Sequence, residues 1–101
     1  MTEEIQLTGK QKRFLRGLGS KLDPVLQIGK GGVLPGVVAQ ARDALEAREL
    51  IKVRILSNCL EDRKEVARLL SERSGAALVQ VLGRTFLLYH PSSQDPQIQL
   101  P

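Results

Sequence analysis

Residues 24–38 of this 101-residue chain read Pro-Val-Leu-Gln-Ile-Gly-Lys-Gly-Gly-Val-Leu-Pro-Gly-Val-Val. The apolar and β-branched run Val25–Ile28 is typical of a short strand, and Gly29-Lys30-Gly31-Gly32 ends it. A helical pattern then runs from Val33 to about Arg48, because apolar residues recur at intervals of three and four. These residues are Leu34, Val37, Val38, Ala41 and Leu45. The stretch therefore predicts a strand, a glycine-rich turn and a helix in direct succession.

The residues before this stretch predict another helix. Thr8 is a suitable N-cap, and the helix extends to about Gly19. Asp23-Pro24 separates it from the strand, because proline disfavours a helical conformation in the residue before it. The apolar stripe of this helix comprises Phe14, Leu15, Leu18 and then Leu22. Its basic residues fall outside that stripe and are expected to face water.

Two elements follow the central stretch. Residues 50–56 alternate between apolar and basic side chains, as in a strand with one covered face. Lys52 and Arg54 lie on its other face, where they either bind phosphate or form an ordinary solvated surface. A third helix is expected over about 60–74, with Asn58 as its N-cap and Gly75 as its stop. The acids of its first turn are Glu61, Asp62 and Glu65.

The last regular segments form a predicted hairpin. Ala77–Leu82 and Thr85–Tyr89 have strand patterns and are joined by Gly83-Arg84, a two-residue connection that contains glycine. The element order is α-β-α-β-α-β-β. Alternating helices and strands predict an α/β fold, a two-layer sandwich in which three helices cover one face of a four-stranded mixed sheet. We assign residues 1–92 to this domain and 93–101 to a polar tail that lies along the surface or frays.

Composition narrows the class of protein. Hydrophobic residues make up 42% and charged residues 26%, as in an ordinary globular domain, whereas aromatic residues make up only 3%. One cysteine, Cys59, and one histidine, His90, exclude an internal disulfide and the usual zinc sites. Residues 1–7 carry Glu3 and Glu4, unlike a signal peptide, and no run approaches a membrane span. We therefore expect a cytoplasmic protein without metal or cofactor.

Positive charge is concentrated in one quarter of the chain. The net charge is +4, and residues 8–32 contain six basic residues against the single acid Asp23. The basic residues are Lys10, Lys12, Arg13, Arg16, Lys21 and Lys30. Such asymmetry favours an anionic partner, although a solvated face of a mildly basic protein would have the same composition.

The Gly29-Lys30-Gly31-Gly32 loop has the composition of an anion site. Glycine allows a tight turn and close approach of another backbone, and the following helix directs unpaired N–H groups to the same place. We expect the amides of Gly31 and Gly32, with Lys30, to hold phosphates. If the first helix packs beside this loop, the two form one cationic surface. The spacing matches neither a Walker loop nor a dinucleotide-binding fingerprint. Plain turn glycines are the structural alternative.

Several segments together resemble a known family, the CRM domain in its stand-alone bacterial form, the YhbY-like proteins. The matching segments are Thr8–Gly19, Pro24–Val33, Glu49–Arg54, Gly75 with its following strand, and Val81–Pro91. The resemblance covers about residues 5–92. It implies a KH-like fold, close to the C-terminal domain of bacterial translation initiation factor three. It also implies RNA binding, with bacterial members associated with precursors of the large ribosomal subunit.

The resemblance also implies the site. By position, the family's loop corresponds to Gly29, Lys30, Gly31 and Gly32, and its basic first helix corresponds to Lys10, Lys12, Arg13, Arg16 and Lys21. We expect a non-enzymatic RNA-binding protein, monomeric when free, that acts in large-subunit assembly. The alternative is a protein-interaction module whose basic face meets an acidic partner. An enzyme is a more distant alternative, because no nucleophile–base pair or metal cluster is visible.

Overall fold

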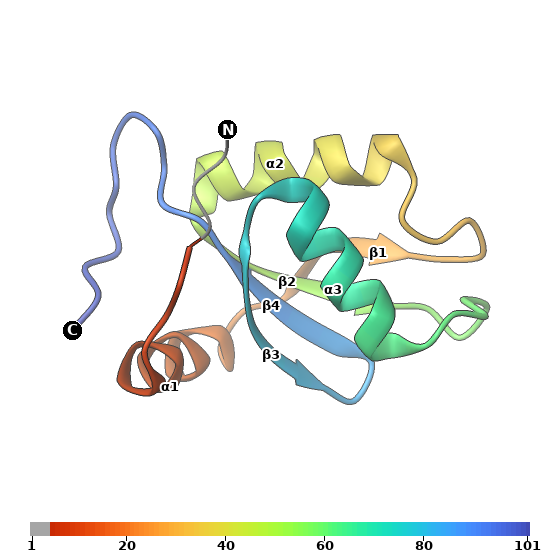
Figure 1. Ribbon diagram of the computed structural model, residues 1–101, viewed down its shortest axis with the longest axis horizontal. Coiled ribbons are helices and arrows are strands. Elements are labelled where there is room, and N and C mark those ends of the chain that lie inside the picture. The colour runs from red at the N-terminus through yellow and green to blue at the C-terminus, as the bar shows by residue number, and fades with distance from the viewer. Residues whose placement is uncertain (1–4) are drawn as a thin grey trace.

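The computed structural model describes residues 5–101 and contains the predicted elements in the predicted order (Figure 1). Glu3 and Glu4, which figured in the signal-peptide argument, lie outside the described residues. None of the helices within 5–101 is long and apolar enough to cross a membrane. The elements are α1 (Gly9–Gly19), β1 (Pro24–Ile28), α2 (Pro35–Arg48), β2 (Leu50–Ile55), α3 (Arg63–Ser74), β3 (Ala77–Leu82) and β4 (Thr85–Tyr89).

The four strands form one mixed sheet in the order β1-β2-β4-β3. β1 pairs with β2 in parallel, since α2 forms the crossover between them, and the other two pairings are antiparallel. Gly83 has a φ of 59° in the β3–β4 turn, a conformation that favours glycine. The α/β class and the four-stranded mixed sheet are thus confirmed.

Two helices begin later than predicted. α2 starts at Pro35, because proline keeps Leu34 extended (φ −87°, ψ 159°). α3 starts at Arg63, and its N-cap is Asp62, whose carboxylate accepts the Glu65 N–H at 3.3 Å. The prediction of Asn58 as the cap is therefore wrong. α1 begins as predicted, since Thr8 and Gln11 form a reciprocal capping box.

The helices do not all cover the same face of the sheet. The main core lies between the sheet and α2 with α3, and contains Ile51, Val53, Phe86 and Leu88. α1 packs on the opposite face, where Leu15 contacts a second cluster that includes Leu50, Val79, Leu87 and Tyr89. The two-layer body therefore consists of the sheet with α2 and α3. The expectation of three helices on one face is wrong, because β4 buries residues of both faces.

The C-terminal tail is packed along the surface. Ile98 and Leu100 contact the cluster around Leu15, and the Gln11 side chain donates a hydrogen bond to the Pro101 carbonyl at 3.3 Å. Glu49 is 2% exposed, and its carboxylate accepts backbone N–H groups from Ser92, Gln97 and Ile98 at 2.6–2.9 Å. The tail thus packs against the cluster that α1 forms with the sheet, and Gln11 links it to α1.

Candidate nucleic-acid interface

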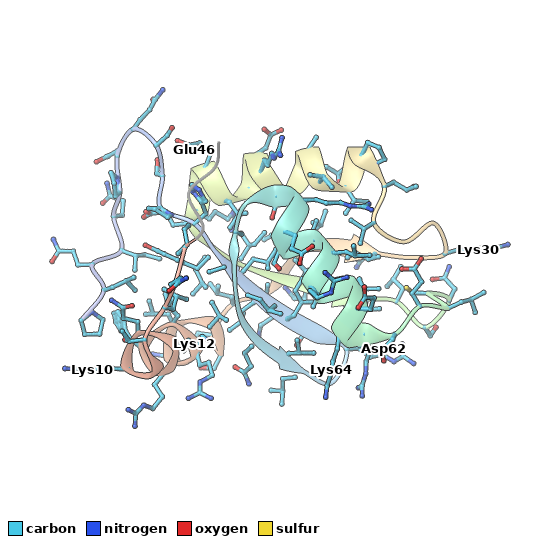
Figure 2. The ribbon with its side chains drawn as sticks, viewed as in Figure 1. Lys10, Lys12, Lys30, Glu46, Asp62 and Lys64 are labelled. Atoms are coloured by element: carbon cyan, nitrogen blue, oxygen red, sulfur yellow. The ribbon has the colours of Figure 1, made fainter. Side chains whose placement is uncertain are left out.

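The glycine loop after β1 forms a tight turn. Gly32 has a φ of 69°, which favours glycine, and its N–H donates to the Gly29 carbonyl at 3.0 Å. Lys30 lies in this turn and extends into solvent at one end of the molecule (Figure 2). The loop therefore presents a cationic side chain on a short, defined turn.

Only part of the expected amide cradle is free. The Gly32 N–H is used within the turn, and the Leu34 N–H donates to the Gly32 carbonyl at 3.1 Å. The Gly31 N–H has no hydrogen-bond acceptor within residues 5–101. Gly36 and Val37 follow Pro35 in the first turn of α2, which has no side-chain cap. The groups that remain to contact an anion at this loop are the Gly31 N–H, the Lys30 side chain and the N-terminal end of α2.

An acidic side chain that sequence reasoning assigned to a helix lies beside this loop. A Cβ atom at Gly32 would be 3.1 Å from Glu61 Oε1, so the carboxylate lies directly against the turn. Because α3 begins at Arg63, Glu61 belongs to the preceding loop and not to the first turn of the helix. The negative charge of Glu61 therefore repels a phosphate that binds at this turn. Gly31 in turn lies against Leu34, which is 51% exposed.

The basic residues expected on the first helix are all exposed, as predicted. They are Lys10, Lys12, Arg13 and Arg16 on α1 and Lys21 just after it. Within residues 5–101, none of them forms an ion pair or a side-chain hydrogen bond. α1 is oriented by the burial of Leu15 against the sheet, which leaves these cations available to a partner.

The loop and α1 are not side by side. Lys30 lies at one end of the long dimension of the molecule, whereas Lys10 and Lys12 lie near the other end (Figure 2). Residues 20–28 connect the end of α1 to the loop, and the five residues of β1 among them span about 16 Å. The structure therefore does not place the first helix beside the loop.

The other arginines are mostly engaged within the protein. Arg42, Arg63, Arg73 and Arg84 donate to backbone carbonyls, and Arg68 pairs with Glu65 and Glu72. Ten basic residues have no such partner within residues 5–101, and we call them the unpaired bases. They are Lys10, Lys12, Arg13, Arg16, Lys21, Lys30, Arg48, Lys52, Arg54 and Lys64. Bases that serve the fold are thereby distinguished from bases that remain available.

Aromatic stacking and metal chemistry have little support in the part of the chain that is described. Phe86 and Tyr89 are both buried, one on each face of the sheet, and neither is available to stack on a base, whereas Phe14 on α1 is half-buried. His90 is half-buried beside the Pro91 carbonyl. Residues 5–101 contain no group of three histidine, cysteine or acidic side chains that could hold a metal ion.

Comparison with known proteins identifies relatives along nearly the whole chain. The model of the CRS1/YhbY (CRM) domain matches residues 7–90. The chain is 53% identical over 95 residues to the probable RNA-binding protein YqeI of Bacillus subtilis, covering 94% of this chain and 99% of that protein. It is 39% identical over 95 residues to an RNA-binding protein of Haemophilus influenzae, covering 94% and 95% respectively.

A solved structure has the same fold. The solution structure of the hypothetical protein SAV1595 from Staphylococcus aureus superposes with a TM-score of 0.80 at 49% sequence identity. The match covers 95% of this chain and all of that one. The fold inferred from the element order is therefore found in a close relative.

Proposed function

The chain belongs to the CRS1/YhbY (CRM) domain family, and on this premise we propose that it is a non-enzymatic protein that binds RNA. The observation that carries the proposal is the distribution of its unpaired bases. Six of the ten lie on α1, just after it or in the Gly29–Gly32 loop, and the arginines of the α2–α3 side are largely engaged in internal hydrogen bonds. The names of its relatives support RNA as the anionic partner.

Recognition depends on the RNA backbone. Lys30 and the Gly31 N–H contact phosphate at the loop, and Lys10, Lys12, Arg13, Arg16 and Lys21 contact phosphates along α1. Because Phe86 and Tyr89 are buried, Phe14 of α1 is the one half-buried aromatic side chain within residues 5–101, and stacking on aromatic side chains contributes little. Affinity therefore comes from charge and from the shape of the RNA, and it falls steeply with salt.

We further propose precursors of the large ribosomal subunit as the target and the cytoplasm as the location. The family resemblance of the loop and the first helix supports this target. A small, monomeric, basic protein that holds RNA backbone is suited to binding ribosomal RNA while the subunit assembles. Its single cysteine, Cys59, is compatible with a reducing compartment.

The test is a titration of the protein with labelled RNA at several salt concentrations. Single-stranded RNA, a fragment of large-subunit ribosomal RNA and duplex DNA are compared. If about five phosphates are neutralised, the log–log slope for single-stranded RNA is about −3.5. Lys30→Glu with Arg16→Glu is expected to abolish most of the binding and to leave the melting temperature unchanged, since both side chains are exposed. Glu61→Gln removes the carboxylate beside Gly32 and is expected to tighten binding.

The outcomes separate the alternatives. Tighter binding to the ribosomal fragment than to other RNA supports the assembly role. Unchanged affinity in the Lys30→Glu/Arg16→Glu variant would exclude the proposed surface. Absence of RNA binding at low salt would contradict the proposal and favour an acidic protein partner, whose complex would resist ribonuclease.

A further inference from the structure

Part of the sheet face on the α1 side is not covered by α1. α1 covers the end of this face that holds Leu50, Leu87 and Tyr89. Beyond its end, the same face carries side chains that alternate with the buried core residues along each strand. They are Val25 and Gln27 of β1, Lys52 and Arg54 of β2, Thr85 of β4, and Gln80 and Leu82 of β3. We call this surface the open face, and within residues 5–101 no helix or hydrophobic cluster covers it.

A hollow lies where α1 meets the open face. It has a volume of about 310 Å³. Arg16 of α1 lines one side, and Lys52 and Gln80 of the sheet line the other. Leu82, which is 67% exposed, forms an apolar part of its wall. Gly19 brings the end of α1 so close to Leu87 that a Cβ there would overlap the leucine side chain.

The hollow is positively charged, and no carboxylate within residues 5–101 pairs with the bases that line it. Lys52 is half-buried, yet no carboxylate pairs with it within residues 5–101. Arg16 and Arg54 are also among the unpaired bases. Among residues 5–101, no acidic side chain lines the hollow. Asp23 precedes Pro24, the partner of Lys52 in the sheet, but it is exposed and does not line the hollow. A basic hollow whose described lining contains no acidic side chain is suited to an anionic ligand.

The open face also connects the two parts of the proposed RNA site. In the parallel β1–β2 pair, Pro24 lies opposite Lys52, Gln27 opposite Arg54, and Ile28 opposite Ile55. Arg54 is therefore nearer than Lys52 to the loop that follows Ile28. A row of bases thus runs from the end of α1 across the open face to the glycine loop. In order, it comprises Arg16, Lys52, Arg54 and Lys30.

We propose that single-stranded RNA crosses this open face, with a nucleotide seated in the hollow between α1 and the sheet. Its phosphate lies between Arg16 and Lys52, and its base or ribose lies against Leu82. The strand continues past Arg54 to Lys30. The inference rests on the proposed function. It adds the path of the RNA on the protein and the prediction that the bound RNA is single-stranded. A hollow at the small end of ligand-site volumes takes one nucleotide unit, and a basic groove with apolar contacts suits an unpaired strand.

The test uses a labelled oligo-uridine of about twelve nucleotides and two double variants of equal charge change. Lys52→Gln with Arg54→Gln removes the two strand bases from the open face. Arg48→Gln with Lys64→Gln is the matched control, since both residues are exposed, unpaired bases on α2 and α3. The open-face variant is expected to lose about tenfold in affinity, and its salt slope is expected to be shallower by about 1.4. The control is expected to change little in either quantity.

A third variant separates the apolar contact from the charges. Leu82→Ala is expected to weaken binding several-fold while the salt slope stays that of the wild type, because no phosphate contact is removed. Leu82 is exposed, so this variant keeps the fold if Lys52→Gln perturbs it. A duplex RNA competitor is expected to displace the oligo-uridine poorly.

The measurements distinguish a wrong path for the RNA from a wrong proposed function. The crossing path is wrong if the open-face variant binds like its control and Leu82→Ala binds like the wild type. The proposed function still stands in that case, provided that the wild type binds oligo-uridine and Lys30→Glu/Arg16→Glu weakens the binding. If the wild type does not bind RNA, the proposed function fails, and this inference with it.

Discussion

Glu49 shows how one residue fixes the tail and, through it, α1. It ends α2 with a φ of 67°, an unfavourable backbone conformation for a residue with a side chain. Burial by itself would raise the pKa of Glu49, but the backbone N–H groups of Ser92, Ile98 and Gln97 outweigh it, and the pKa is lowered. The ionised carboxylate is thus the form that holds the tail.

Replacement of Glu49 should therefore have a pH-dependent effect on stability. A lowered pKa in the folded state stabilises the protein above the pKa of the unfolded chain, about 4.3, and this stabilisation is lost as the pH falls through the folded pKa. Glu49→Gln is expected to lower the free energy of unfolding by about 1–3 kcal/mol at pH 7 and by less as the pH falls below about 4. Denaturant titrations at several pH values measure the difference from the wild type.

Asp43→Asn is the control for this measurement, since Asp43 is an exposed acid of α2 with no side-chain hydrogen bond within residues 5–101. Equal stability of Glu49→Gln and Asp43→Asn at pH 7 would show that the carboxylate does not hold the tail.

The position of α1 depends on how closely it approaches the sheet. Gly19 at its end lies against Leu87, whereas Gly17, two residues earlier and exposed, has nothing within 4 Å of a Cβ position. Glycine at 19 is thus required by packing, and glycine at 17 is not. The two positions provide a matched pair in one helix.

Alanine at these two positions is expected to act in opposite directions. Gly19→Ala overpacks the contact with buried Leu87 and is expected to lower the free energy of unfolding by about 1–3 kcal/mol. Gly17→Ala is expected to raise it by up to about 1 kcal/mol, since alanine favours an exposed helix interior. Thermal unfolding of both variants measures this, and a stabilising Gly19→Ala would mean that α1 is not docked as described.

The sequence patterns predicted the helices and strands well, but they did not predict which face of the sheet each helix covers. Capping and stop residues located α1 and the end of α3, because their signals are local. The face covered by α1 depends on tertiary packing, and its signal is weak. The run Phe86-Leu87-Leu88-Tyr89 is apolar without alternation, as expected of a strand buried on both faces, and it shows that a helix or loop must cover each side.

On the scale of the whole molecule, sequence reasoning identified the charged segments but not their arrangement. The basic residues of α1 and Lys30 are exposed as predicted, since a helix stripe and a glycine turn determine exposure locally. The separation of the loop from α1 follows from the direction of β1 and from the face of the sheet that α1 covers, which no local pattern encodes. Glu61 was missed for the same reason, because only the fold brings it to Gly32.

The central claim is that one surface, from the Gly29–Gly32 loop across the open face to α1, binds single-stranded RNA. The most direct measurement is the change in backbone amide chemical shifts as labelled protein is titrated with oligo-uridine. We predict the largest changes at Lys30 and Gly31, at residues 52–54, and along α1 to Lys21, with α2 and α3 beyond their first turns nearly unchanged. Changes confined to the outer surfaces of α2 and α3, with the loop and α1 unaffected, would contradict the account.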